Sequence, residues 1–335
     1  MELYLDSANM QEIEEAFQLG FLAGLTTTPT FMHRDGITNI DETILKLSKM
    51  VPVLQVEALG DNAQEIRDEA QRLVDLGLDK QKSVFKIPIS LEGAKACNML
   101  IKEGFLVNLH LVYTIQQAYI ALSAGATYVC PLVGRLQDQG QDALGLVGQC
   151  VDAVEMYGYD SKIMFSSVRH AEHVKNAINI GVHTCTIPWK VMKQLTDNHF
   201  TQLGTQQFVD HTRLMTQTVG GTIRSNEATI NHSKNIVDAL VTMTQSKLGA
   251  VTIVDDNNNI VGIFTDGDLR RQIEGKGQSV LQQQLSSLDL NVPLSVEAGI
   301  TLFEASKVFK ERKVDTLVVT KDGKPAGMLD IQDLI

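Results

Sequence analysis

Short runs of β-branched and apolar residues alternate with amphipathic helical patterns through the first two thirds of the chain. Eight such runs predict strands, at 2–7, 22–27, 52–58, 83–89, 106–112, 127–133, 162–168 and 183–188. Helical periodicity lies between them, as at 9–20, 62–77 and 91–104. Eight strand–helix units in about 200 residues are enough for a closed (β/α)₈ barrel. A doubly wound sheet is the rival, but no G-x-G-x-x-G follows an early strand, so we expect the α/β barrel.

The last third of the chain contains a repeated pattern with a period of about 65 residues. The segments 228–273 and 293–335 each contain a helical stretch, two strand-like runs joined by a turn, and an acidic helix start. Two such units can bury a shared core where one alone could not. The predicted domains are therefore a (β/α)₈ TIM barrel, a connecting segment and a smaller α/β domain of two copies, at 1–205, 206–225 and 226–335 (226–275 and 290–335).

Composition and charge narrow the class of protein. Hydrophobic residues make up 44% and charged residues 21% of the chain, which is ordinary for a globular protein. The net charge of -11 argues against nucleic acid as the main partner, because phosphate backbones require a basic surface, but it allows a local basic pocket. The first residues, MELYLDSANM, do not match a signal peptide, and no apolar run predicts a membrane span. We therefore expect a cytoplasmic protein with four reduced cysteines and no membrane partner.

Polar residues gather at the predicted carboxyl ends of the barrel strands, where barrels of this kind carry their catalytic groups. These residues are Asp6, Thr26, Thr27, Thr28, Gln55, Glu57, Lys86, Asn108, His110, Arg135, Ser166, Ser167 and Arg169. Arginine binds phosphate through two parallel hydrogen bonds, and barrels often hold phosphate near strands seven and eight. Arg135, Ser167 and Arg169 are therefore predicted to form a phosphate clamp.

Lys86 lies in SVFKIPIS, on a strand that should be buried on both faces. An unpaired ammonium there is costly, so we expect the pKa of Lys86 to fall toward neutrality. A neutral amine attacks carbonyl carbons and forms a Schiff base. The alternative is a structural ion pair with Asp6 or Glu57. Asp6 itself is placed to move a proton to or from a substrate hydroxyl or carbinolamine, and its alternative is a cap for the helix that starts near Met10.

Several motifs resemble the transaldolase family, most closely its short branch that includes fructose-6-phosphate aldolase. They are MELYLDSA, LAGLTTTPT, VFKIPIS, VGR at 133–135 and FSSVRH. The resemblance implies a metal-free class I mechanism without a cofactor, in which Lys86 forms the Schiff base with a ketose and Asp6 is the acid and base. The imine then accepts electrons while the C3–C4 bond breaks, and the ketol fragment passes to an aldehyde or is released by water.

Other site residues are carried over by the same resemblance. Gln55 matches the residue that positions a catalytic water in the aldolase branch, and His110 replaces a threonine that helps to hold this water. An imidazole at that place could itself act as the base, since its ordinary pKa is near neutrality. Thr28 replaces the usual asparagine, which implies a changed donor or acceptor preference. The remaining residues implied to contact substrate are Thr26, Thr27, Asn108, Cys130, Leu132 and Arg135, with Cys130 in place of serine and Leu132 in place of an aromatic residue.

The repeat in the last third resembles a pair of CBS domains. GIFTDGDL (262–269) is similar to the nucleotide-contacting stretch, which implies that Thr265 and Asp268 hold a ribose. GMLDIQDL (327–334) places Asp330 and Asp333 at the corresponding positions. GIFTDGDLRR is also similar to the CBS part of arabinose-5-phosphate isomerases. The resemblance implies a regulatory nucleotide or nucleotide-sugar ligand, and the alternative is a pair that only dimerises the protein.

The prediction is an enzyme: a Schiff-base transaldolase or aldolase acting on a sugar phosphate, in a homo-oligomer. One alternative is an aldolase that makes a pentose phosphate such as arabinose 5-phosphate for Kdo and lipopolysaccharide synthesis. Another is a catalytically silent barrel that senses sugar phosphates, suggested by Thr28, His110 and Leu132. A metal-dependent aldolase is the third, but only His170 and His173 have ligand-like spacing, and this pair is more typical of a solvated helix start.

Overall fold

The computed structural model describes residues 1–223 and 228–334. The chain divides into two compact units, residues 1–197 and residues 198–335. Each unit is described by itself. The predicted end of the connection at 225 and the predicted start of the CBS pair at 226 lie outside the described residues, and the predicted domain boundaries stay predictions.

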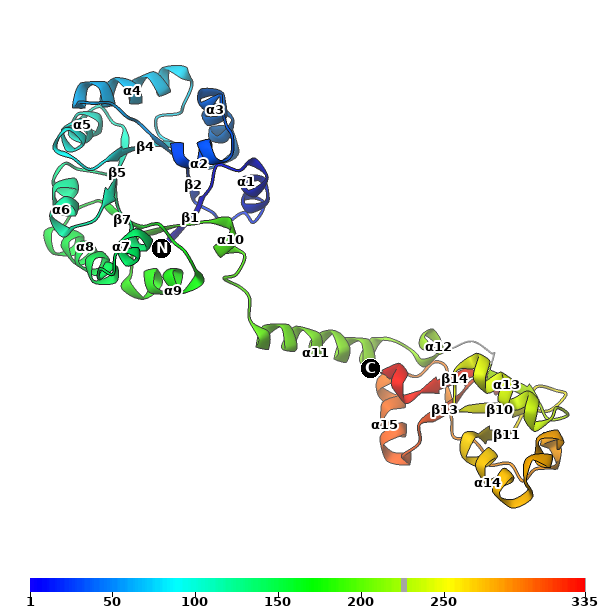
Figure 1. Cartoon of the computed structure of the whole chain (residues 1–335). Coiled ribbons are helices and arrows are strands. Elements are labelled where there is room, and N and C mark those ends of the chain that lie inside the picture. The colour runs from blue at the N-terminus through cyan, green and yellow to red at the C-terminus, as the bar shows by residue number, and fades with distance from the viewer. Residues whose placement is uncertain (224–227, 335) are drawn as a thin grey trace. The chain divides into compact units, whose positions relative to one another are not determined.

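The first unit is a closed barrel of eight strands in the order β1 to β8, all parallel to their neighbours (Figure 1). The strands are β1 Glu2–Asp6, β2 Gly24–Thr26, β3 Leu54–Glu57, β4 Ser83–Pro88, β5 Leu106–Val112, β6 Tyr128–Pro131, β7 Lys162–Phe165 and β8 Thr184–Ile187. The predicted (β/α)₈ TIM barrel is therefore confirmed.

Helices surround the barrel strands, as Figure 1 shows. They are α1 Met10–Phe17, α2 Pro29–Arg34, α3 Ile40–Met50, α4 Ala63–Leu76, α5 Leu91–Lys102, α6 Ile115–Ser123, α7 Val133–Asp138, α8 Ala143–Tyr157, α9 Ala171–Ile180 and α10 Trp189–Met192. Local capping explains several starts, because side chains such as Asn62 and Ser90 accept hydrogen bonds from backbone N–H groups of the first turn. In the described part of the chain, no helix is long and apolar enough to span a bilayer.

Alternation along the strands creates two separate cores in the first unit. Successive side chains of a strand point to opposite faces of the sheet. One set packs against the helices in the larger cluster, with Leu5, Val56, Phe85, Leu109 and Ile187 among its members. The other set faces the barrel interior, where Tyr4, Val84, Tyr128, Cys130 and Met164 form their own cluster.

The second unit contains two three-stranded sheets that repeat one arrangement. Its strands are β9 Thr229–Asn231, β10 Ala250–Val254, β11 Ile260–Thr265, β12 Ser295–Glu297, β13 Thr316–Lys321 and β14 Lys324–Asp330. Its helices are α11 His199–Thr216, α12 Val219–Thr222, α13 Ile236–Ser246, α14 Asp266–Lys276 and α15 Leu302–Arg312, with 3₁₀ turns η2 Gln278–Gln282, η3 Leu285–Ser287 and η4 Ile331–Leu334. In each half a strand and a helix precede an antiparallel hairpin.

The two halves of the second unit share a core. Ala228, Leu248 and Ala250 of the first half cluster with Val318 and Met328 of the second half. Each half also has its own cluster around its helix. Burial of apolar surface between the halves explains why the repeat occurs twice, since a single small sheet with one helix buries little apolar surface.

Candidate active site

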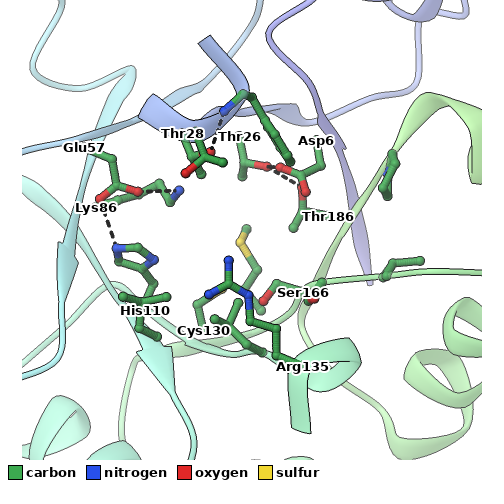
Figure 2. Close-up of a pocket in the computed structure, with 18 of the residues that line it drawn as sticks. Asp6, Thr26, Thr28, Glu57, Lys86, His110, Cys130, Arg135, Ser166 and Thr186 are labelled. Carbon is green, nitrogen blue, oxygen red and sulfur yellow. Dashed lines mark hydrogen bonds and ion pairs between the residues drawn. The ribbon is translucent and has the colours of Figure 1, made fainter. Parts of the chain in front are cut away.

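A cavity of about 740 Å³ opens at the carboxyl ends of the barrel strands. Residues from all eight strands line it, and Figure 2 shows Asp6, Glu57, Lys86, His110 and Thr186 pointing toward its centre. Asp6 and Lys86 lie on the inward faces of their strands, because each is two positions on from an inward residue, Tyr4 or Val84. Glu57 and His110 are likewise two positions on from the buried polar residues Gln55 and Asn108.

Lys86 and His110 contact the same carboxylate. The Nζ of Lys86, which is 5% exposed, donates to Glu57 Oε1 at 2.9 Å and to the Thr27 carbonyl oxygen at 2.9 Å. The Nε2 of His110 lies 2.9 Å from Glu57 Oε2, within ion-pair distance but without the alignment of a straight hydrogen bond. The carboxylate of Glu57 thus contacts both Lys86 on β4 and His110 on β5.

Burial and charge shift the protonation of this cluster. Burial raises the pKa of Glu57, but Lys86 and His110 outweigh burial, so the pKa of Glu57 lies below its ordinary value. Burial lowers the pKa of His110, and the charges of Lys86 and Arg135 add to this while Glu57 opposes it. The favoured state is therefore an ionised Glu57 beside a neutral imidazole.

Asp6 lies at the end of β1 and lines the same cavity as Lys86. Its Oδ1 accepts a hydrogen bond of 2.8 Å from the Thr26 hydroxyl, which in turn contacts the hydroxyl of Thr186. Burial raises the pKa of Asp6, and Lys86 and Thr26 oppose this rise. The cap of α1 is Asn9, so the alternative role predicted for Asp6 as a helix cap is wrong.

Three residues of the predicted site lie below or behind the cavity surface. Gln55 and Asn108 are fully buried and bonded to each other, with Asn108 Nδ2 donating to Gln55 Oε1 at 2.7 Å. Thr27 contacts Lys86 through its backbone oxygen, while its buried hydroxyl has no partner among the described residues. None of the three lines the cavity. The substrate contacts predicted for Asn108 and Thr27, and the positioning of a catalytic water predicted for Gln55, therefore stay predictions.

Cationic side chains surround the mouth of the cavity. Arg135 on α7 and Arg169 after β7 line it, as do Arg34 on α2 and Lys190 on α10. Arg169 pairs with Asp138 at 2.7 Å, while Arg135 pairs with no acidic side chain in the described part of the chain. Ser167, between the two arginines of the predicted clamp, is held at a left-handed φ of 60°. A non-glycine residue in this region is strained, as is common at functional sites.

The remaining predicted residues also line the cavity. Thr28 caps α2, because its hydroxyl accepts a hydrogen bond from the Phe31 N–H, and it lies beside the cavity in place of the usual asparagine. Burial raises the pKa of Cys130 to about 11, so it is a neutral thiol at physiological pH. Leu132 adds an apolar surface between β6 and α7.

A family model and several known proteins are similar to the part of the chain that forms this site. The family model described as Transaldolase/Fructose-6-phosphate aldolase matches residues 3–241. A "Probable transaldolase 2" of Bacillus anthracis is 35% identical over 213 residues, covering 62% of this chain and 96% of that protein. A "Probable transaldolase" of Thermoanaerobacter sp. is 37% identical over 214 residues, covering 64% and 97%. This chain belongs to the transaldolase/fructose-6-phosphate aldolase family.

Membership of this transaldolase family confirms the predicted type of enzyme. The CBS domain model matches residues 219–275 and 288–335, which confirms the predicted CBS pair. A crystal structure of a CBS-domain containing protein from Agrobacterium tumefaciens is 24% identical, with a TM-score of 0.32, and covers 36% of this chain and 92% of that one. The resemblance to the CBS part of arabinose-5-phosphate isomerases stays a prediction.

The residues predicted to bind nucleotide are engaged in local contacts. Asp268 Oδ2 accepts hydrogen bonds from the N–H and hydroxyl of Thr265, which together cap α14, and Asp268 also pairs with Arg271. In the second copy Asp333 Oδ2 accepts from the Asp330 N–H at 2.9 Å. The two copies therefore repeat one carboxylate-to-backbone contact, and the ribose contact stays a prediction.

Sequence reasoning missed several residues of this transaldolase-family site. Glu57 was considered only as a partner of Lys86, Ser166 was grouped with the strand-end residues without a role, and Thr186, Met164, Arg34 and Lys190 were not considered. Thr186 could have been found as a polar residue near the end of β8, where it pairs with Tyr4 of the neighbouring strand β1, two residues before Asp6. Among the described residues no group of three or more His, Cys, Asp or Glu side chains is placed to hold a metal ion.

Proposed function

We propose that this protein is a Schiff-base enzyme that transfers or releases a ketol fragment of a sugar phosphate. The observation that carries this proposal is the amine of Lys86, nearly inaccessible to bulk water, in a large cavity that it shares with the buried carboxyl of Asp6. A nucleophile and a separate proton acceptor in one water-poor site are what covalent carbonyl chemistry requires.

The reaction follows from these two groups. The uncharged amine of Lys86 adds to the ketone carbon of the sugar, and loss of water gives an iminium ion. Asp6 then removes the proton of the C4 hydroxyl, the C3–C4 bond breaks, and its electrons move into the iminium to give an enamine. The raised pKa of Asp6 makes it a stronger base than an exposed carboxylate. An aldehyde acceptor or water completes the cycle.

The charge of the cavity mouth supports a phosphorylated substrate. The chain as a whole carries a net charge of -11, yet Arg34, Arg135, Arg169 and Lys190 lie at this mouth. Phosphate is bound well by arginine, and a local positive field also attracts an anionic substrate. We include Ser167, beside Arg169, as a further donor to the phosphate.

Borohydride trapping tests the proposal. The wild type is incubated with ketose phosphates, with dihydroxyacetone and with glycolaldehyde, each with and without aldehyde acceptors, then reduced and analysed by mass spectrometry. We expect a ketol adduct on Lys86, and no adduct in Lys86→Met. A panel of products then separates transaldolase from aldolase, and shows whether a pentose phosphate forms.

The ion pair between Lys86 and Glu57 favours a second candidate function, a sugar-phosphate sensor without turnover. In that case Lys86 has only a structural role, and sugar phosphates bind without a covalent bond. Calorimetric binding of a sugar phosphate to a wild type that forms no adduct with any donor would support the sensor and contradict the enzyme.

We also infer a regulatory role for the CBS pair. Thr265 and Asp268 in the first copy, and Asp330 and Asp333 in the second, would contact a nucleotide or nucleotide sugar. The repeated cap geometry of the two copies supports two equivalent sites. Association of copies of this chain into a homo-oligomer stays a prediction.

A further inference from the structure

Among the described residues that line the cavity, Glu57 is the carboxylate with a lysine amine on one oxygen and an imidazole on the other. Its side chain is 7% exposed, Lys86 Nζ lies 2.9 Å from Oε1, and His110 Nε2 lies 2.9 Å from Oε2. The barrel register produces this arrangement, because Glu57 pairs with Lys86 across β3 and β4, and His110 lies two residues beyond the β5 partner of Lys86. The transaldolase chemistry described above does not use Glu57.

The contact with Glu57 decides which nitrogen of His110 carries the proton. A neutral imidazole has one N–H and one bare nitrogen, and an ionised carboxylate can only accept. Nε2 lies 2.9 Å from Glu57 Oε2, and two bare acceptor atoms repel each other at that distance. The hydrogen is therefore favoured on Nε2 although the contact is not straight, which leaves Nδ1 bare. Figure 2 shows the second ring nitrogen turned away from Glu57 toward the cavity. His110 thus presents a proton acceptor to the space beside Lys86.

The charged groups around His110 come from four elements. Glu57 on β3 stabilises the imidazolium form, whereas Lys86 on β4 and Arg135 on α7 disfavour it. Asp6 on β1 lines the opposite part of the cavity, where it bonds with Thr26. His110 therefore starts neutral, and Glu57 lies where it can stabilise the charge that the ring gains when it accepts a proton.

We propose that Glu57 is a positioning residue that holds His110 in one tautomer, so that His110 carries protons from the nitrogen of Lys86 to the departing oxygen during Schiff-base formation. The inference rests on the proposed function. The inference gives the two proton acceptors of the site different roles. His110 accepts protons from the nitrogen of Lys86, and Asp6 accepts the proton of the C4 hydroxyl.

The proton transfer balances without an outside acid or base. The ammonium of Lys86 has three hydrogens, and the iminium nitrogen keeps one of them. Nδ1 of His110 first takes one proton from the ammonium, which gives the nitrogen a lone pair. The C–N bond then forms as the C=O π bond breaks, and His110 gives that proton to the oxygen. A second transfer in the same direction converts the hydroxyl into water, which leaves as the C=N bond forms. The two hydrogens lost by nitrogen are the two gained by water.

A set of variants tests this role of Glu57. We expect Glu57→Gln to lower kcat about 100-fold, the size typical of general acid–base catalysis, and to slow adduct formation in borohydride trapping. KM for the sugar phosphate should change by less than about threefold, because the phosphate contacts lie elsewhere. The acid inflection of the kcat profile should move to lower pH, since removal of the carboxylate lowers the pKa of His110. Glu14→Gln, which removes an exposed carboxylate on α1, is the control.

Two further measurements keep the inference falsifiable if Glu57→Gln loses stability. Lys86→Met is used as the background, because the Lys86 amine would otherwise be left without its carboxylate partner when Glu57 is replaced. In this background, ¹⁵N NMR of His110 reports which ring nitrogen carries the hydrogen. We expect one tautomer in Lys86→Met, and both tautomers with titration at lower pH in Lys86→Met/Glu57→Gln. The same tautomer and the same titration in both would overturn the proposal.

The double variant His110→Gln/Glu57→Gln separates action through His110 from action through Lys86. If Glu57 acts through His110, its substitution costs little more once His110 is gone, because the two losses are not additive. A second full 100-fold loss would overturn the proposal. Absence of any adduct in the wild type would instead contradict the proposed function, while the NMR result would still decide the role of Glu57.

Discussion

Asp6 has an ionisable carboxyl in a place where water stabilises its charge poorly. Burial raises its pKa, and the opposing effects of Lys86 and the Thr26 hydroxyl do not cancel this rise. A carboxyl with a raised pKa in the folded state favours folding when it is protonated, and its charge reduces stability at higher pH. The residue proposed as the base of the reaction therefore lowers the stability of the fold at neutral pH.

We predict that Asp6→Asn is more stable and much less active than the wild type. The amide keeps the shape and still accepts from Thr26, so at pH 7 the free energy of unfolding should rise. Turnover should fall by about 100-fold or more. Chemical unfolding at several pH values checks the sign, because the gain should vanish as pH falls below about 4, where both states protonate Asp6. Equal stabilisation at pH 3 and pH 7 would contradict this account.

His173 shows the opposite sign of pH dependence. It is buried, its Nδ1 accepts from the Arg169 N–H at 3.2 Å, and its Nε2 lies 2.6 Å from Gln137 Oε1. Burial, together with the nearby His170 and Arg169, lowers the pKa of His173 to about 4. A lowered pKa means that the fold requires the neutral ring, so stability is complete above the ordinary pKa and is lost as pH falls.

We predict that His173 contributes to acid unfolding. Between about pH 6.5 and pH 4, protonation of the unfolded chain should reduce the stability of the wild type by about 3 kcal/mol relative to His173→Gln. Denaturant unfolding at half-unit pH steps measures this difference. The exposed His199→Gln serves as the control and should follow the wild type. Parallel curves for the wild type and His173→Gln would show that His173 does not contribute.

Close approach of two elements brings together the residues of the proposed phosphate clamp. A Cβ added at Gly134 on α7 would lie 2.2 Å from the Ser167 carbonyl oxygen and 2.7 Å from Arg169 Nε. Only glycine therefore lets α7, which carries Arg135, pack against the segment that carries Ser167 and Arg169. By contrast, a Cβ at Gly148 on α8 would meet nothing within 4 Å.

We predict that Gly134→Ala separates the two sides of the clamp. Overpacking at this contact should cost about 1–3 kcal/mol of stability, and KM for phosphorylated substrates should rise more than KM for unphosphorylated analogues. Gly148→Ala is the matched control and should gain up to about 1 kcal/mol, as glycine does when replaced in a helix. Thermal unfolding and paired kinetics provide the readouts. An unchanged preference for phosphorylated substrates in Gly134→Ala would contradict the role of the clamp.

The hydrophobic pattern predicted the barrel but extended most strands too far. The predicted strand at 162–168 continues beyond β7, which ends at Phe165, because Ser166 and Val168 are buried in the following loop. Buried loops over a barrel mouth have the same apolar character as strands, so periodicity cannot separate the two. Val133 and Arg135 were likewise predicted to lie in or directly after the sixth strand, but both lie in the short helix α7.

Register explains which part of the site the sequence could not reveal. Lys86, Asp6 and His110 were predicted because each is a polar residue on an apolar strand. The contact of His110 with Glu57 depends on how far β3 and β5 are shifted relative to β4. This shift is fixed by closure of the whole barrel, which is a tertiary property. The pattern within one strand does not contain it.

The whole molecule combines an enzyme barrel with a CBS pair, and the charges of the chain are unevenly spread. Cationic residues gather at the barrel cavity, while the turn and helix starts of the pair carry acidic residues such as Asp266 and Asp268. An acidic site suits ribose hydroxyls, which donate hydrogen bonds to carboxylates, rather than bare phosphate. We therefore expect the two units to bind different ligands.

We predict that a nucleotide binds the full chain through Asp268. AMP, ADP and ATP are the probes, and a bound nucleotide at about 100 times its Kd should stabilise the CBS pair by about 2.7 kcal/mol. Asp268→Asn should lose this response, together with up to about 1 kcal/mol from the charge at the start of α14.

Glu304→Gln is the matched control for Asp268→Asn, because Glu304 completes the same capping arrangement on α15 outside the predicted nucleotide stretch. The amide oxygens of both variants still accept from the cap N–H, so each variant loses only the negative charge at its helix start. Glu304→Gln should keep the nucleotide response in thermal unfolding and in kcat/KM of the barrel. Stabilisation of Asp268→Asn equal to that of the wild type would place the ligand elsewhere. No response to any nucleotide in the wild type would favour a pair that only associates copies of this chain, because a bound ligand must raise the stability of the state that holds it.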